Sequence, residues 1–216
     1  MSTLEQAKQL KQSGLKFVPL LPKEKKNFDK DIDTKIYDLS EVSDKGNLGI
    51  SLHLNNLTVA DPETDHAIYF ANHYLSRFKT MRSFREYQNG YKKTVGYFFQ
   101  NSLNLKENLQ LDTKIMEFRV KGQQVVYGTT ITKDTKEEVK RSFNSVQPIH
   151  LTKEIVKEVK KVAFLGYMAE VIKSANTGAL MLDSCIMRYT DYTEDERYDL
   201  LWYFFNHILP DADDTK

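Results

Sequence analysis

Cysteine, long apolar runs and an excess of charge of either sign are what this sequence most clearly lacks. Cys185 is the only cysteine in 216 residues, which excludes an intramolecular disulfide and a cysteine-rich zinc site. It stands in the apolar stretch LMLDSCIMRY, so we expect a buried core thiol. No apolar run approaches the ~20 residues that a membrane span needs, and the first 14 residues lack the apolar core of a signal peptide. We therefore expect a cytoplasmic protein with no membrane partner.

The charges of the chain are nearly balanced, with 31 Lys and Arg residues against 30 Asp and Glu residues and a formal net charge of +1. A protein that coats duplex DNA by bulk charge is therefore excluded, and any contact with a nucleic acid requires a local basic patch. Hydrophobic residues make up 40% of the chain, which is enough for a substantial core.

The first two thirds of the chain alternate between helical and extended patterns. The spacing of apolar residues predicts helices over 3–13, ended by Gly14, and over 64–78. Short apolar or alternating stretches predict strands over 17–21, 47–52, 57–61, 93–100, 114–121 and 123–131. The last two strands flank Lys121-Gly122, which predicts a hairpin between them.

After Pro148 the sequence has little strand character and its apolar residues recur at helical spacing. Three helical patterns follow, over 152–176, 178–190 and 193–209. We expect an α+β domain over 1–148, with a mixed or antiparallel sheet flanked by helices, and a small all-α helical bundle over 149–216.

The last of these helices has a clear start and a broad apolar surface. Thr193 and Glu196 form a capping-box pair at its beginning. Large apolar residues, among them Tyr198 and Trp202, cover much of its circumference, which favours a helix-bundle core over a base-stacking platform.

Acidic residues at the end of one predicted strand suggest a metal site. If the extended conformation persists through Pro62, Asp61 and Glu63 point to the same side of the chain. Glu117 lies on the polar face of an alternating strand and could complete a three-carboxylate site for a divalent ion. The alternative is that Asp-Pro-Glu serves as the N-cap of the helix that follows.

Basic and aromatic residues interleave over residues 77–93, which carry six basic side chains and one acidic one, a net charge of +5. Such a mixture is typical of sites that bind triphosphates or single strands. Arg82, Lys92 and Lys93 are the first candidates for contacting a triphosphate or a template. The alternative is a solvated loop whose aromatic residues fold into the core. Arg119 is a further candidate for binding a phosphate, or else forms an ion pair with Glu117.

The order of these motifs resembles a known family. An opening helix is followed by GLKFVPLLPKEKK, NLGISL, LTVADPE with its helix, KTVGYFF and IMEFRVKGQQVVYGTT. Over roughly residues 4–131 this order is similar to the bifunctional DNA primase/polymerase (prim-pol) domain of replication proteins from plasmids, phages and other mobile elements. The helical remainder is similar to the template-binding helical domain that often follows in that family.

The resemblance implies an archaeo-eukaryotic primase-like fold and nucleotidyl transfer. Asp61 and Glu63 match the paired acids of the family and Glu117 matches its third acid, so these residues would hold Mg²⁺ or Mn²⁺. Single-stranded DNA would be the template, and nucleoside triphosphates the substrates. The chain has no Gly-x-x-x-x-Gly-Lys motif, so a replicative helicase would act in trans or from a downstream part of a longer chain.

Two departures from the family pattern leave alternatives open. The family's nucleotide-binding histidine falls near Gly96 or Tyr97, where this chain has none. An alignment on Pro-Glu instead places Thr58 and Ala60 at the metal positions, which would give a degenerate site.

Further basic residues are candidates for contacting nucleic acid, and they lie in the lysine-bearing loop, the basic stretch and the helical segment. They are Lys25, Lys26, Arg85, Lys157 and Lys160. The sequence thus favours a primase-polymerase. It leaves open a DNA-binding accessory module with a decayed site, and an interaction protein with no role at nucleic acid.

Overall fold

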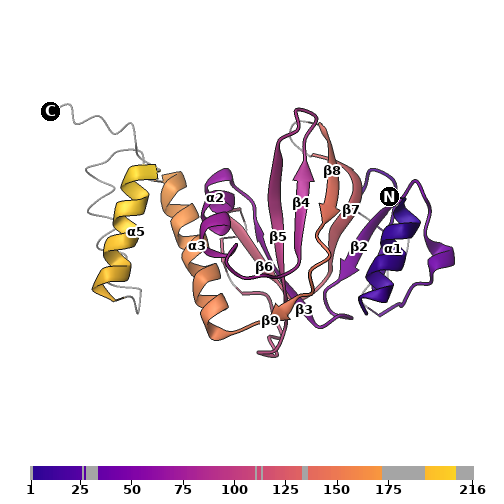
Figure 1. Ribbon diagram of the computed structural model, residues 1–216, viewed down its shortest axis with the longest axis horizontal. Helices are drawn as coiled ribbons and strands as arrows, with labels where there is room; N and C mark the ends of the chain where they lie inside the picture. The colour runs from indigo at the N-terminus through magenta and orange to yellow at the C-terminus, as the bar shows by residue number, and fades with distance from the viewer. Residues whose placement is uncertain are drawn as a thin grey trace.

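The computed structural model describes residues 2–25, 27, 34–109, 111–112, 114–132, 136–171 and 193–207. Four α-helices lie within them (Figure 1): α1 (Thr3–Gln12), α2 (Asp65–Tyr74), α3 (Lys153–Val171) and α5 (Glu194–His207), together with a short 3-10 helix, η1 (Leu39–Glu41). The strands are β1 (Phe17–Leu20), β2 (Asn47–Ser51), β3 (Leu57–Pro62), β4 (Arg82–Glu86), β5 (Lys92–Gln100), β6 (Met116–Arg119), β7 (Gln123–Ile131), β8 (Glu138–Phe143) and β9 (Ile149–His150). The predicted mixture of helices with an antiparallel sheet is confirmed. Lys26, Cys185 and the predicted helix 178–190 lie outside the described residues.

The strands form one curled sheet in the order β1-β2-β7-β8-β4-β5-β3-β6, with the short β9 beside β5. The neighbours along this order pair antiparallel, and β9 pairs parallel with β5. In Figure 1, α1 lies beside β2 at one end of the sheet, and α2 and α3 lie beside β5 and β6 at the other.

Two apolar cores cover opposite faces of β3, because successive side chains of a strand point to opposite sides. Val59 is fully buried in the core that includes Ala7 and Leu10 of α1. Ala60, the next residue, is buried in the core formed with α2 and α3. Asp61 follows on the same side as Val59, where the first core ends. The alternation therefore places a carboxylate at the edge of an apolar interior.

The strand β3 remains extended through Pro62, as the shared orientation of Asp61 and Glu63 requires. The backbone N–H of Glu63 donates to the carbonyl of Ile115 at 2.8 Å, which continues the pairing one residue further. The N-cap of α2 is Thr64, whose hydroxyl accepts from the N–H of Ala67 at 3.1 Å. The alternative in which Asp-Pro-Glu caps this helix is therefore wrong.

The predicted hairpin at Lys121-Gly122 is also wrong. Gly122 does turn the chain, with φ of +83°. The two strands that it joins do not pair with each other, because β6 pairs with β3 while β7 lies between β2 and β8. Gly122 correctly indicated a turn of the chain, but β6 and β7 each pair with strands that are distant in sequence.

Three strands, β4, β8 and the two-residue β9, were not predicted. The interpretation of residues 77–93 as a solvated loop fails for β4, which pairs with both β5 and β8. Arg141 interrupts the apolar alternation of β8 between Val139 and Phe143, and this hid the strand in the sequence.

The segment after Pro148 shares a core with the sheet. Ile155 and Leu165 of α3 and Leu200 of α5 are buried with Phe118 of β6 in one cluster. The capping box at the start of α5 is confirmed: the N–H of Thr193 donates to Glu196 Oε2 at 2.9 Å, and the N–H of Glu196 donates to the Thr193 hydroxyl at 3.3 Å.

The outer face of α5 differs from the prediction. Tyr198 and Trp202, which we expected in a helix-bundle core, are 68% and 54% exposed.

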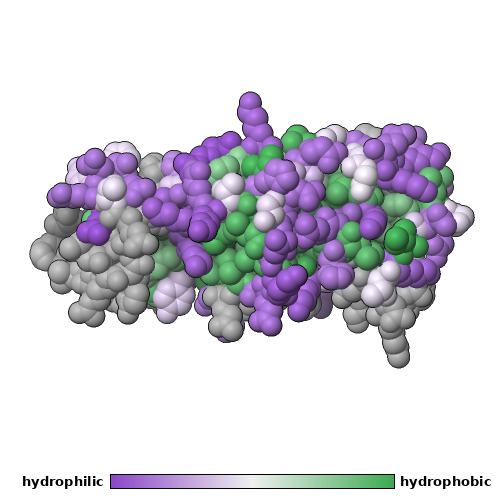
Figure 2. Space-filling view, turned by 90° about the horizontal axis from the view of Figure 1, so that it is seen from below, coloured by the Kyte–Doolittle hydropathy of each residue, from purple (hydrophilic) through white to green (hydrophobic). Residues whose placement is uncertain are grey.

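Polar and hydrophobic residues are interspersed on the face of the molecule seen in Figure 2. Among the described residues, no helix combines the length and the apolar character that crossing a membrane requires.

A glycine in β7 provides a test of the sheet's packing. Gly128 has φ of +111°, and a Cβ built there would lie 2.0 Å from Asn47 Oδ1. That Asn47 side chain is fixed by bonds to Thr129 N, Thr129 O and Glu24 O. We expect Gly128→Ala to lower the free energy of unfolding by about 2–5 kcal/mol, from backbone strain and overpacking together.

Gly14→Ala is the matched control for this prediction. Gly14 also has positive φ, +75°, but a Cβ there meets nothing within 4 Å. We expect only the backbone cost, about 1–2 kcal/mol, in urea unfolding. Equal losses in the two variants would contradict the packing of Asn47 against Gly128.

Candidate metal and phosphate site

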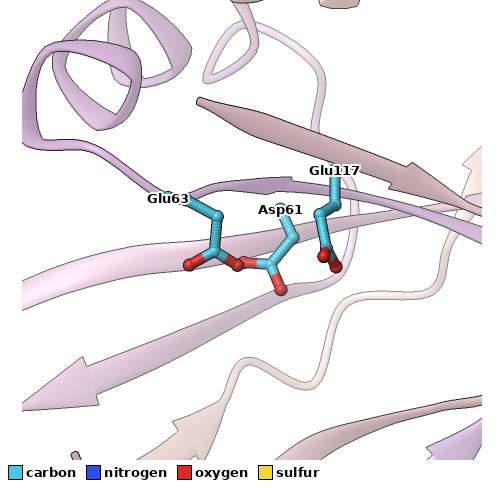
Figure 3. Close-up of side chains that lie close together, drawn as sticks. All are labelled: Asp61, Glu63 and Glu117. Carbon is cyan, nitrogen blue, oxygen red and sulfur yellow. The ribbon is translucent and has the colours of Figure 1, made fainter. Parts of the chain in front are cut away.

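Three carboxylates converge at the end of β3. Asp61 and Glu117 are directly opposite each other in the antiparallel β3–β6 pair, and Glu63 follows Asp61 by two residues. One carboxylate oxygen from each lies within 4.8 Å of the others. Figure 3 shows the three side chains pointing into the same space from neighbouring segments. This acidic triad could bind a metal ion, and it corresponds to the register predicted with Asp61 and Glu63.

The alternative register, with Thr58 and Ala60 at the metal positions, does not fit the structure. Ala60 faces the core beneath α2 and α3, on the other side of β3 from Asp61. The Thr58 hydroxyl donates to the carbonyl of Arg119 at 2.9 Å.

Asp61 is the most buried member of the triad, with 4% of the residue exposed. Burial and the nearby charge of Glu63 together raise the pKa of its carboxyl to about 6, against the opposing effects of Arg119, Arg85 and a hydrogen bond from Gln124. Asp61 Oδ2 accepts from Gln124 Nε2 at 2.8 Å, whereas its buried Oδ1 has no hydrogen-bond partner in the described structure. A buried carboxylate oxygen without a partner is costly, and a cation at the triad would satisfy it.

Arg119 partly neutralises the triad. Its guanidinium lies 3.1 Å from Glu117 Oε2 and 3.6 Å from Asp61 Oδ2. The ion pair proposed as the alternative role of Arg119 is therefore present. Among the described residues, Arg119 is the basic residue in ion-pair contact with the triad, so close ion pairs neutralise only part of the charge of the three carboxylates.

A row of basic side chains crosses three adjacent strands. Arg85 of β4 is directly opposite Arg141 of β8 on one side and Lys93 of β5 on the other. Arg141 is 5% exposed, and burial together with the charge of Arg85 lowers its pKa to about 10. Like charges directly opposite each other destabilise a sheet. An anion lying against these side chains would relieve the repulsion, as the charges of Asp61 and Glu63 already do in part for Arg141.

Lys25 adds a further positive charge beside this basic row, of which Lys93 is the member on β5. Burial alone would lower the pKa of Lys93, but hydrogen bonds with Tyr87 and Asp65 raise it. Its ammonium lies 3.2 Å from Asp65 Oδ1. Partial desolvation and the charges of Arg141 and Arg85 lower the pKa of Lys25.

The triad and the basic row line one cavity of about 660 Å³. It also includes Tyr87, Gln123, Gln124 and Glu137. Pockets of roughly 300–1,000 Å³ are typical of small-molecule and cofactor sites. The cavity can therefore hold a cation against the acids and a polyanion against the bases.

The period of β4 decides which predicted basic residues reach this cavity. Arg85 is among its lining residues, whereas Arg82 faces the opposite side and lies over the Tyr97 ring, 5.4 Å from its centroid. A register shift between Ser83 and Phe84 in the β4–β5 pair brings Lys93 to the cavity side. Lys92 instead lies over the Phe84 ring, 4.5 Å from its centroid, outside the cavity lining.

The remaining predicted residues divide in the same way. Lys25 and Arg119 line the cavity. Lys157 and Lys160 lie on α3 away from that lining, and Lys157 is 3.6 Å from Glu196. Lys26 lies outside the described residues.

Arg141 and Gln124 are among the cavity residues that the sequence analysis did not identify. Arg141 belongs to the unpredicted strand β8, and its Nε donates to the Thr130 hydroxyl at 3.0 Å. Gln124 lies in a strand that was predicted, yet a glutamine in GQQVVYG carries no signal of a functional role. Only the closeness of β7 to β3 identifies it.

A scan of the chain against models of known protein families found no match, and neither did a search of curated proteins.

The raised pKa of Asp61 predicts a pH dependence of stability in metal-free buffer. The folded protein holds this proton up to about pH 6, whereas the carboxyl's ordinary pKa is 3.8. The stabilisation is therefore complete below about pH 4 and is lost as the pH rises to about 6. We expect Asp61→Asn to be more stable than the native chain by about 1–3 kcal/mol at pH 7.5 in EDTA, and nearly equal at pH 4.

Chemical denaturation at the two pH values measures this difference, with Asp44→Asn as the control at an exposed carboxylate. Addition of Mn²⁺ at pH 7.5 should raise the melting temperature of the native chain and leave Asp61→Asn unchanged. An Asp61→Asn variant less stable than the native chain in EDTA at pH 7.5 would contradict the prediction.

Proposed function

We propose that this chain is a metal-dependent nucleotidyl transferase of the primase-polymerase class, which synthesises or extends primers on single-stranded DNA during replication of a mobile element. The observation that carries the proposal is the pairing of an acidic triad with a row of basic side chains in one cavity. The order of sequence motifs supports the class.

The residues of the triad fit Mg²⁺ or Mn²⁺. These hard cations prefer carboxylate oxygens, and Asp61, Glu63 and Glu117 offer them without nitrogen or sulfur ligands. When bound, such ions neutralise phosphate charge and activate the attacking hydroxyl in nucleotidyl transfer. The partnerless Oδ1 of buried Asp61 is the atom best placed to ligate one.

The basic row is suited to a nucleoside triphosphate. Arg85, Arg141 and Lys93 lie side by side across three strands, so they present positive charge over a length rather than at a point. Guanidinium groups bind phosphate oxygens through two parallel hydrogen bonds, and the desolvation of Arg141 strengthens such bonds. These residues would hold the triphosphate while the triad faces its reacting phosphate.

The family's nucleotide-binding histidine falls near Gly96 or Tyr97, where this chain has no histidine. A Cβ at Gly96 would lie 2.6 Å from the Ser83 hydroxyl, and the adjacent Tyr97 faces the core beneath α2 and α3. Neither position can present a side chain to the cavity without rearrangement. Arg85 and Arg141 supply positive charge to the cavity from other strands.

The first experiment is primer synthesis and primer extension on single-stranded DNA with Mg²⁺ or Mn²⁺. We expect activity in the native chain and its loss in Asp61→Ala/Glu63→Ala, because the variant cannot neutralise charge in the transition state. Circular dichroism and a thermal melt verify that the variant is folded. A native chain that binds DNA but makes and extends no primer would instead indicate a catalytically degenerate accessory module.

Arg85 and Lys92 both lie in the basic stretch 77–93, but of the two Arg85 alone lines the cavity. Substituting each in turn tests whether the cavity itself binds the nucleotide. We expect Arg85→Met to weaken binding of a nucleoside triphosphate about 10-fold or more, because a charged hydrogen bond contributes about 1.5–3 kcal/mol. Lys92→Met removes a neighbouring charge outside the cavity lining and should change the Kd less than about twofold. Fluorescence titration with a labelled triphosphate measures both. Equal losses would show that net charge, rather than the cavity, attracts the nucleotide.

A further inference from the structure

Gln124 links the two most closely associated charged groups of the site. Its Nε2 donates to Asp61 Oδ2 at 2.8 Å, and its Oε1 accepts from Arg119 Nη2. The side chain is almost wholly enclosed, with 6% of the residue exposed. Both ends of the Gln124 amide are therefore engaged, one by the candidate metal ligand Asp61 and the other by the neighbouring cation Arg119.

The neighbours of this amide fix its orientation. A carboxylate accepts hydrogen bonds and a guanidinium only donates them. If the amide were flipped, its oxygen would face the Asp61 carboxylate and its NH₂ would face the Arg119 guanidinium, and both contacts would be repulsive. The side chain thus has one favourable state, determined by the charges on either side.

The consequence for Asp61 is that its two oxygens are no longer equivalent. Oδ2 is engaged by Gln124, while Oδ1 is buried and has no hydrogen-bond partner in the described structure. Glu63 and Glu117 each place an oxygen within 4.8 Å of the ligand oxygen that Asp61 offers. A hydrogen bond on one oxygen that turns the other toward a cation is the usual contribution of a residue behind a metal ligand.

Gln124 also restrains Arg119. The guanidinium lies 3.1 Å from Glu117 and 3.6 Å from Asp61, close enough to compete with a metal ion for both carboxylates. The amide oxygen gives Arg119 a third, neutral acceptor. Without it, the acceptors left beside the guanidinium among the described residues are the carboxylates of the triad, and Arg119 would compete more strongly for them.

We propose that Gln124 is a positioning residue for the metal site, which orients Asp61 toward the cation and holds Arg119 back from the triad. This inference rests on the proposed metal-dependent function. It assigns to Gln124 an effect on metal affinity that a merely structural buried amide would not have.

The test is the Mn²⁺ affinity of Gln124→Leu, measured by electron paramagnetic resonance on the full chain at one pH and without nucleotide. Residues behind metal ligands typically change affinity 10–100-fold, so we expect the Kd for Mn²⁺ to rise about 10-fold or more. Gln124→Met, with an unbranched side chain of similar length, serves as a second variant if Gln124→Leu does not fold, and the same rise is expected.

Asn101→Leu is the matched control. Asn101 is likewise 6% exposed, and its amide makes two hydrogen bonds, to Leu105 N and Leu105 O, away from the triad. We expect a comparable fall in melting temperature and an unchanged Kd for Mn²⁺. The comparison separates lost stability from lost positioning.

The possible outcomes distinguish the proposed role of Gln124 from the proposed metal site itself. If the native chain binds Mn²⁺, Asp61→Asn abolishes the binding and the folded Gln124 variants bind as the native chain does, the role of Gln124 is refuted while the metal site stands. If the native chain itself shows no Mn²⁺ binding that depends on Asp61, both proposals fail. A weakened Kd in both Gln124→Leu and Asn101→Leu would also refute a specific role for Gln124.

Discussion

Like charges placed opposite each other across adjacent strands are the constraint on which the site depends. Asp61 opposes Glu117 between β3 and β6, and Arg85 opposes both Arg141 and Lys93 between β4 and its neighbours. Neither group is favourable by itself, because each brings charges of one sign together in a partly desolvated space. The two groups share a cavity, in which Arg119 and Gln124 contact the acidic group. The arrangement is thus prepared for ligands of both signs.

The two apolar cores allow the sheet to tolerate these charges. One core lies beneath α1 and the other beneath α2 and α3, and each buries large side chains such as Phe98 or Phe118 completely or nearly so. Because the cores cover different sides of β3, the strand is held on both faces and its end has little freedom. The rigidity keeps Asp61 desolvated, and the desolvation makes its charged form costly without a cation. The packing of the two cores therefore contributes to the energetic cost of a charged Asp61 that has no cation beside it.

Much of the site was accessible to sequence analysis because strands have a period of two. The alternation along 57–63 placed Asp61 and Glu63 on one side, and the alternation of Met116 and Phe118 with Glu117 and Arg119 separated the core face from the cavity face. The same period also divides the predicted basic residues between the two faces of the sheet. In β4, Arg82 and Arg85 point to opposite faces, and nothing local indicates which face carries the cavity. The strand β8 and its Arg141 were missed, since a buried arginine breaks the pattern by which strands are found.

The sequence by itself determined the balance of charge, the helix start at Thr193 and Glu196, the end of α1 at Gly14, and the sidedness of the acidic residues. These depend on interactions between residues a few positions apart. Tertiary structure alone decided that β6 pairs with β3 rather than with β7, and that Arg141 lies beside Arg85. It also decided that the Gln124 amide reaches Asp61, 63 positions away. Strand partners are selected by burial and packing over the whole chain, and no local spacing records that selection.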